Sequence, residues 1–367
     1  MDEAPVDSLE SLALQKKPGG QQTKTRVSWY SLMRCIALIV LLGYSLSLVN
    51  FRFRAGIRTD TGTSKVVPRC PTYATLQEML TFASMQIPTS KDGKQEQKGI
   101  VFTTVTIDKG TASHVEWVSN WYHQLQNVGV HHPIVFGADD TGETCRIVQS
   151  AGMCCRNFQP ADFTSLDEDL LILLNTTRDG QRPPAVDIKF FYAFQLLSYG
   201  YRISFSDDDV FWFKHPFVDN EFDEDMRGLT DDRSNDEQPD GWTSTSCGLE
   251  YGSPCMSTGL WDIYPTDSSI NFILGLLGGL KTTRMWEQQL ANEYLKNERY
   301  KDGDGKMSFR LFPKITHLNV GVLDQRVANN QDVNLTAVHL GYVHGANKLV
   351  EYKKRGYWNP GNISIGL

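Results

Sequence analysis

Short apolar runs alternate along the chain with segments whose apolar residues have helical spacing. Residues 99–106 and 132–138 are each typical of a buried strand, and residues 113–127 between them are typical of an amphipathic helix. Further helices are expected over 143–151 and 186–198, since each segment is followed by a glycine. Strands that alternate with helices predict an α/β domain with a mostly parallel, Rossmann-like sheet and helices on both faces.

The helix over 186–198 leads into residues 201–212, which begin as an alternating strand pattern and then run into Asp207, Asp208 and Asp209. Three adjacent carboxylates repel one another and do not favour a strand. A Mg²⁺ or Mn²⁺ ion would relieve this repulsion, because hard cations prefer oxygen ligands. Open α/β sheets bind their ligands at the carboxyl ends of strands. The pattern therefore predicts a metal site, with a capped turn as the alternative.

The first part of the chain is distinct from this domain. Residues 1–28 are polar and are expected to form a cytosolic disordered tail. Residues 35–49 carry no charge, and the longer segment 29–51 is predicted to be a single transmembrane signal anchor. Residues 52–69 are expected to form a stem, and residues 70–367 a lumenal domain. Basic residues flank the span on both sides, so the positive-inside rule does not decide the orientation.

Two other features favour a lumenal domain. Asn-x-Ser/Thr sequons begin at Asn175, Asn334 and Asn362. Six cysteines outside the span could form three disulfides; they are Cys70, Cys145, Cys154, Cys155, Cys247 and Cys255. A disulfide is expected between the last two, with two buried thiols as the alternative. The short span suits a thin membrane. We therefore expect a single-pass type II protein of the Golgi membrane.

Charge narrows the choice of partners. The net charge of −7 argues against nucleic-acid binding. Residues 219–240 contain ten carboxylates without the spacing of metal ligands, and a solvated surface loop is expected there. Residues 302–305 superficially resemble a calcium loop, but the closing Glu is missing, so a turn is expected.

Several motifs follow one another in a fixed order over residues 99–358. They are Thr103-Thr-Val105, Asp187-Ile-Lys-Phe190, Ser206 to Trp212, Ser257-Thr-Gly259, Trp286-Glu-Gln288, Asn319-Val-Gly321, His339 to Gly345, and Lys348 to Trp358. This order resembles the nucleotide-diphospho-sugar transferases of GT-A fold that include plant rhamnogalacturonan xylosyltransferases and extensin arabinosyltransferases. The chain departs from the family pattern at Ser257, Glu287 and Gly341, which bears on acceptor geometry and rate more than on the fold.

The resemblance implies a glycosyltransferase that moves a pentose or hexose from a nucleotide-diphosphate donor, a UDP-sugar being expected, to a glycan or glycoprotein with retention. It implies a Mn²⁺ (or Mg²⁺) ion held by Asp207, Asp209 and His339, with His344 as a competitor for the last position. Asp207 could instead reach the ribose. The expected donor contacts are Thr103, Thr104, Lys189, Asp207, Gly345 and Lys348. Either lysine could equally be a solvated surface residue.

Gln288 and Glu287 are the candidates to lie beside the anomeric carbon. The alternative is that both decorate the surface of a helix over residues 284–297. Two other classes of protein remain as alternatives: a non-catalytic lumenal protein that binds a glycan or nucleotide sugar, and a phosphatase with an Asp nucleophile. Phe211 disfavours the phosphatase, since such enzymes usually have Thr or Val at that position.

Overall fold

The computed structural model describes one compact unit, which lies within Val67–Leu367. The described residues are 70–87, 97–107, 112–139, 141–163, 166, 185–217, 222–231, 256–283, 285–300, 307–341, 343 and 346–358. The tail, the signal anchor and the stem lie outside them, as do His344, Gly345, Cys247, Cys255, Asn175 and Asn362. None of the helices in the described ranges combines the length and hydropathy that a membrane span requires.

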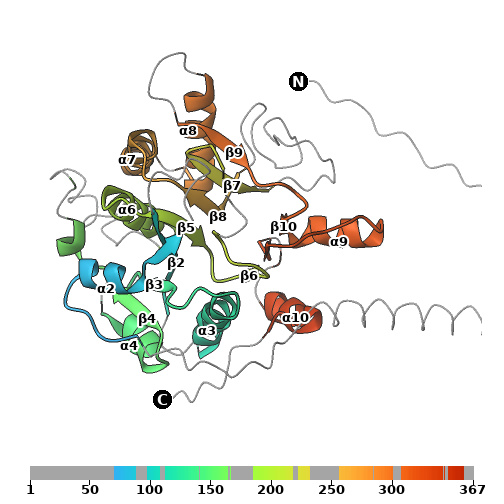
Figure 1. Ribbon diagram of the computed structural model, residues 1–367, viewed down its shortest axis with the longest axis horizontal. Coiled ribbons are helices and arrows are strands. Elements are labelled where there is room, and N and C mark those ends of the chain that lie inside the picture. The colour runs from blue at the N-terminus through green and yellow to red at the C-terminus, as the bar shows by residue number, and fades with distance from the viewer. Residues whose placement is uncertain are drawn as a thin grey trace, which may run out of the picture. The chain divides into compact units, whose positions relative to one another are not determined.

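An eight-stranded sheet lies at the centre of this unit (Figure 1). Its main path runs in the order β4–β3–β2–β5–β8–β7–β9, and β1 pairs antiparallel with β2. The strands are β1 (Met85–Ile87), β2 (Gln97–Val105), β3 (Ile134–Gly137), β4 (Cys154–Asn157), β5 (Arg202–Ser206), β7 (Met226–Thr230), β8 (Met256–Ile263) and β9 (Phe309–Leu311). The pairs from β4 to β5 are parallel, whereas β8 runs against both of its neighbours. The predicted α/β class with a mostly parallel sheet is confirmed.

Helices cover both faces of this sheet. Among the described residues, the α-helices that pack against it are α2 (Leu76–Ala83), α3 (Ala112–Asn127), α4 (Glu143–Ser150), α6 (Ala185–Ser198), α7 (Asp267–Thr282) and α8 (Glu287–Tyr300). Two further helices, α9 (Val320–Ala328) and α10 (Ala346–Arg355), pack elsewhere. Phe102 packs in a core with α2, α6, α7 and α8, whereas its neighbour Val101 packs in a second core with α3 and α4. Adjacent residues of a strand point to opposite faces, so the continuous apolar run of β2 fits a sheet that is buried on both sides.

The element boundaries follow the sequence pattern closely. The helices predicted over 113–127, 143–151 and 186–198 are α3, α4 and α6, and each boundary lies within one residue of its prediction. The strand predicted from residue 132 begins two residues later, at Ile134. Pro133 explains this difference, because proline has no N–H to donate to a ladder.

A second, three-stranded sheet lies beside the end of β5. Its strands are β10 (His317–Asn319), β11 (Ala337–His339) and β6 (Val210–Trp212), in the order β10–β11–β6. Figure 1 shows β6 leaving β5 toward β10, with α9 and α10 nearby. A third apolar core joins these elements and includes Phe211, Val338 and Tyr352. The segment 201–212 thus forms two strands that belong to two different sheets, and the three aspartates lie between them.

His317 of β10 provides a pH-dependent contribution to stability. It is fully buried and stacks on Phe312 at 4.0 Å between ring centroids. Burial, with help from Arg227 and Lys214, lowers the pKa of His317 from 6.5 to about 3. The unfolded chain therefore takes up this proton at a higher pH than the folded protein, and stability falls as the pH is lowered from 6.5 toward 3.

We expect the wild type to lose roughly 2 kcal/mol at pH 5 through His317, relative to a His317→Phe variant. Phenylalanine keeps the stacking on Phe312 but does not titrate. The measurement is the urea unfolding midpoint of both proteins at pH 7.5 and pH 5. Equal losses of stability in the two proteins would contradict this account.

Two disulfides connect strand β4 to other parts of the unit. Cys70 is bonded to Cys154, and Cys145 of α4 is bonded to Cys155. The adjacent cysteines of β4 point in opposite directions, as neighbours in a strand do, and so reach different partners. Two of the three expected bridges are therefore present among the described residues. The bridge predicted between Cys247 and Cys255 lies outside them and stays a prediction.

The two disulfides should differ in their contribution to stability. They close segments with sequence separations of 84 and 10 residues. In the chain-entropy model a longer loop loses more unfolded-state entropy, and the difference here is roughly 2 kcal/mol. We expect a Cys70→Ser/Cys154→Ser variant to unfold at a lower urea concentration than Cys145→Ser/Cys155→Ser. The reverse order would show that strain or packing, and not loop closure, dominates.

Candidate metal and donor site

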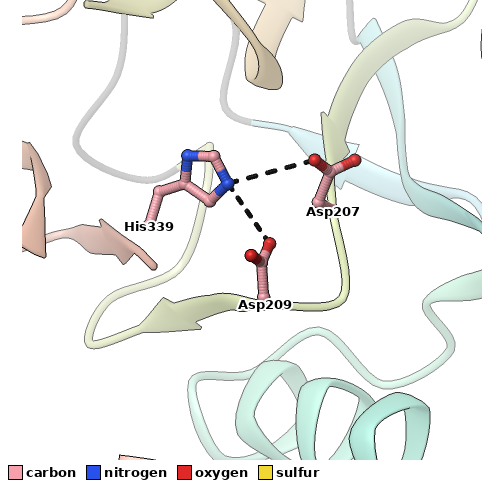
Figure 2. A group of neighbouring side chains, drawn as sticks. All are labelled: Asp207, Asp209 and His339. Atoms are coloured by element: carbon pink, nitrogen blue, oxygen red, sulfur yellow. Dashed lines mark ion pairs between the residues drawn. The ribbon is translucent and has the colours of Figure 1, made fainter. Parts of the chain in front are cut away.

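Two aspartates and a histidine converge where the two sheets meet (Figure 2). Asp207 follows β5, Asp209 precedes β6 and His339 ends β11. Each offers one ligand atom, and these atoms lie within 4.8 Å of one another. His339 Nε2 is 3.2 Å from Asp209 Oδ1 and 3.9 Å from Asp207 Oδ2. The structure therefore brings together the three residues predicted as metal ligands.

The backbone of the turn explains why Asp207 and Asp209 act together. The Asp207 N–H donates to the Gly259 carbonyl at 2.7 Å, and the Val210 N–H donates to the Asp207 carbonyl at 3.2 Å. The Leu340 N–H donates to the Asp209 carbonyl, which ties the turn to the end of β11. Asp208 lies between the two ligands in sequence but outside the group, as the alternation of side chains predicts.

The donor set suits a hard or borderline divalent cation. Two carboxylates and an imidazole are ligands that Mn²⁺ and Mg²⁺ accept, with the imidazole favouring Mn²⁺. Asp209 Oδ1 is buried, and it forms an ion pair with His339 Nε2. The Asp207 side chain, by contrast, is 41 % exposed, so a ligand has access from its side of the group.

Lys348 of α10 already compensates part of this negative charge. Its Nζ contacts Asp209 Oδ2. Burial opposes ionisation of Asp209, but His339 and Lys348 outweigh it and hold the pKa of Asp209 below its usual value. The same contacts raise the pKa of His339 and of Lys348 against the effect of burial. The alternative that Lys348 is a solvated surface residue is therefore wrong.

The other two aspartates hold their protons more tightly. Burial raises the pKa of Asp208 to about 7, and the charges of Asp209 and Asp207 add to this effect. The pKa of Asp207 is also raised, chiefly because the surrounding protein atoms desolvate its carboxyl group even though the side chain is partly exposed, and the Lys189 charge opposes the shift. A divalent cation between Asp207 and Asp209 would therefore favour the charged form of Asp207.

The candidate catalytic pair is buried beside this group. Only 5 % of Glu287 and 6 % of Gln288 is exposed, so the alternative that they decorate a helix surface is wrong. Glu287 Oε1 accepts hydrogen bonds from Lys189 Nζ at 3.3 Å and from Thr258 Oγ1 at 2.9 Å. Glu287 Oε2 is buried with no hydrogen-bond partner among the described residues. One carboxylate oxygen is thus held, and the other is unpaired.

Lys189 is part of this pairing. Its side chain is 2 % exposed, and its Nζ donates to the Thr258 carbonyl as well as to Glu287. Lys189 is therefore not a solvated surface residue. The predicted contact with a donor phosphate stays a prediction, and it would require this buried pair to open.

Asp231, which is not among the residues predicted from the sequence, orients Gln288. The Gln288 Nε2 donates to Asp231 Oδ2 at 2.6 Å, and Gln288 Oε1 accepts from the Thr258 N–H at 3.2 Å. Asn319 Nδ2 donates to the other oxygen of Asp231 at 3.2 Å. Asp231 directly follows β7, which is the same strand-end signal that identified Asp207. The composition of segment 219–240 predicts a solvated loop and so conceals Asp231, but this prediction is wrong for Met226–Thr230, which forms the mostly buried strand β7.

The two threonines lie at the expected edge of the sheet. Phe102 of β2 is level with Phe205 of β5, so Thr103 and Thr104 lie near the level of Asp207. Thr103 is fully buried, whereas Thr104 is partly exposed. Of the two, Thr104 is therefore the one that is partly exposed at this edge.

Two glycines leave room for the His339 ring. A Cβ added at Gly259 would lie 2.7 Å from His339 Cε1 and 2.8 Å from Asp207 Oδ2. A Cβ added at Gly341 would lie 2.6 Å from the same His339 atom. Gly341 is one of the departures from the family pattern, and here its lack of a side chain allows the imidazole to occupy this position.

A protein-family model matches the part of the chain that contains the candidate site. Residues 186–351 match the model of a family described as nucleotide-diphospho-sugar transferase. This match contains the three candidate ligands together with Lys189, Glu287, Gln288 and Lys348. The match covers a little less than half of the chain, confirms the resemblance predicted from the motifs and supports a glycosyltransferase.

The similarity to individual proteins is more distant. The chain is 22 % identical over 232 residues to arabinosyltransferase RRA2 of Arabidopsis thaliana, which covers 59 % of this chain and 51 % of that protein. The chain thus spans about half the length of this curated relative. Among solved structures it is similar to galactosyltransferase LgtC in complex with donor and acceptor sugar analogs, at a TM-score of 0.41 and 12 % identity, covering 71 % of this chain and 96 % of that one. The glycosyltransferase GlyE of Streptococcus pneumoniae TIGR4 has a TM-score of 0.37 and 10 % identity, covering 71 % and 60 %.

Proposed function

We propose that this protein is a metal-dependent, retaining glycosyltransferase that uses a UDP-sugar donor and a glycan or glycoprotein acceptor. The observation that carries the proposal is the convergence of Asp207, Asp209 and His339 within the part of the chain that matches the nucleotide-diphospho-sugar transferase family. Because the curated relative is named an arabinosyltransferase, an arabinose donor is the first candidate.

Different residues of the site would bind the metal, the diphosphate and the sugar. Asp207, Asp209 and His339 would hold Mn²⁺ or Mg²⁺, which when bound neutralises the charge that develops on the leaving diphosphate. Lys348 lies against Asp209, and we expect it to bind a phosphate oxygen once the cation shares that carboxylate. Gln288 is held by Asp231 and Thr258 at both ends of its amide, so its role is to present a fixed face to the sugar.

Glu287 is the better candidate to stabilise positive charge at the anomeric carbon. Its Oε2 is the unpaired oxygen of the pair, whereas the Gln288 carbonyl oxygen is already bonded to the Thr258 N–H. Retention needs a group on the face of the sugar opposite the leaving diphosphate or an ion-pair-like path on the same face. Glu287 could act in either of these two mechanisms.

The disulfides support a place in the secretory pathway, since such bonds persist in oxidising compartments. Asn334, the sequon asparagine within the described residues, is exposed and so accessible to glycosylation. A signal anchor over residues 29–51 and a Golgi location complete the proposal. Glycosidase treatment of the protein expressed in eukaryotic cells should increase its electrophoretic mobility. An unchanged mobility, with protease access from the cytosol, would reject the topology.

The decisive experiment is a donor screen with the full-length chain. UDP-arabinose, UDP-xylose, UDP-galactose and UDP-glucose are each added with Mn²⁺, and both UDP release and the melting temperature are measured. A transferase shows metal-dependent stabilisation together with turnover of one donor. Stabilisation without turnover identifies a binding protein instead. Release of phosphate from a simple phosphate monoester, without any response to UDP-sugars, identifies a phosphatase.

A further inference from the structure

The candidate metal ligands come from two different sheets. Asp207 continues β5 of the large sheet, whereas Asp209 leads into β6 of the small one. His339 belongs to the small sheet as well, because it pairs with Val210 in the register of β11 and β6. The relative position of Asp207 and the other two ligands therefore depends on the angle at which β6 leaves β5.

One buried hydroxyl spans this junction. Ser206, the last residue of β5, is fully buried, and its Oγ accepts a hydrogen bond from Trp212 Nε1 of β6 at 3.3 Å. The same oxygen accepts a hydrogen bond from Trp121 Nε1 of α3 at 2.7 Å. The bond from Trp212 closes the turn Asp207–Asp209 with a side-chain bridge. The bond from Trp121 ties that bridge to a helix that covers the large sheet.

We propose that Ser206 is a positioning residue of the metal site, which holds Asp207 at the correct distance from Asp209 and His339. This inference rests on the metal-dependent function proposed above. Trp121 and Trp212 are also fully or almost fully buried, at 0 % and 2 % exposure, so neither indole N–H can turn to water if Ser206 is lost. Without this acceptor the two rings must shift, and β6 shifts with Trp212.

The Ser206→Ala substitution distinguishes a hydrogen-bonding role of Ser206 from a packing role. An alanine at position 206 fits the same space, because it is smaller by one oxygen atom, yet it cannot accept either indole N–H. Trp212 pairs with Ala337, at the start of β11, so a displacement of Trp212 moves β6 and β11 together. Asp209 and His339 would then move as a unit relative to Asp207. Because the relative position of all three ligands changes, we expect the Ser206→Ala protein to bind the metal more weakly.

The test is the Mn²⁺ affinity of the full-length chain, measured by calorimetry and by Mn²⁺ electron paramagnetic resonance without any sugar nucleotide. Ser206→Ala is expected to weaken binding roughly ten- to a hundredfold, the range typical of residues that orient metal ligands. Ser204→Ala is the matched control. Ser204 is fully buried on the same face of β5, two residues earlier, and lies opposite Asp262 of β8. It should bind Mn²⁺ as the wild type does.

The Mn²⁺ affinities of these proteins can reject the positioning role of Ser206 in several ways. If the wild type binds Mn²⁺ and Ser206→Ala binds within twofold of it, the positioning role is rejected while the proposed function stands. Equal weakening in the Ser204→Ala and Ser206→Ala proteins also rejects it, because loss of any buried hydroxyl would then suffice. If the wild type does not bind Mn²⁺, the proposed function fails and this inference fails with it. Should Ser206→Ala not fold, Trp212→Phe removes the bridging N–H together with part of the buried ring, and wild-type affinity in that variant rejects the proposal.

Discussion

Asp209→Ala is expected to reduce metal-dependent sugar transfer by about a hundredfold or more. Asp209 is a direct candidate ligand, and its loss leaves the charge on the departing diphosphate poorly neutralised. The measurement is donor turnover with saturating Mn²⁺, using whichever UDP-sugar the donor screen identifies. Asp208→Asn is the control, because Asp208 lies in the same turn but outside the ligand group. Near-wild-type turnover by Asp209→Ala, or a larger loss in Asp208→Asn, would overturn the assignment of the site.

The structure also changes the expected stability of this variant. Repulsion among the three aspartates alone would make the metal-free Asp209→Ala protein as stable as the wild type or more stable. Asp209, however, is paired with both Lys348 and His339, and these contacts hold its pKa below the usual value despite burial. We therefore expect a lower melting temperature for the metal-free variant. Asp208→Asn should not show this loss, since the pKa of Asp208 is raised to about 7 and its charge is unfavourable.

Lys189→Met is expected to destabilise the fold by about 3–5 kcal/mol. The substitution removes the cation from a buried pair and leaves Glu287 as an uncompensated charge, with side-chain exposures of 2 % and 4 % for the two partners. Burial at this level prevents water from taking over the role of the lysine. The measurement is the free energy of unfolding in urea, read together with the melting temperature without metal or donor.

The double variant Lys189→Met/Glu287→Gln distinguishes the two roles of Lys189. Glutamine is uncharged and can still accept the Thr258 hydroxyl, so most of the lost stability should return. If Lys189 instead serves chiefly to bind a donor phosphate, Lys189→Met should leave the unfolding midpoint nearly unchanged. It would then raise the KM for the UDP-sugar, and the second substitution would not restore stability.

The relation between sequence and structure differs from one part of the site to another. The Asp207–Asp209 turn was predictable because its signals are local: an apolar strand pattern and three carboxylates occur within a few residues. The motif order pointed to His339, although it lies more than a hundred residues away in sequence. Asp231 carried the same strand-end signal as Asp207, but the surrounding acidic residues concealed it.

The apolar periodicity of the sequence by itself determined the helices, most strands and the α/β class, because burial on one or both faces imposes a period on the residues of each element. Side-chain partners could not be determined in this way. The pairs Lys189–Glu287, Cys70–Cys154 and Trp121–Ser206 join elements that are far apart in sequence. Only the order and packing of the strands bring these groups together. For the same reason, only the tertiary structure showed that the metal ligands come from two sheets. The sequence on either side of Asp207–Asp209 is typical of strands, but it does not indicate that the chain passes from one sheet to the other there.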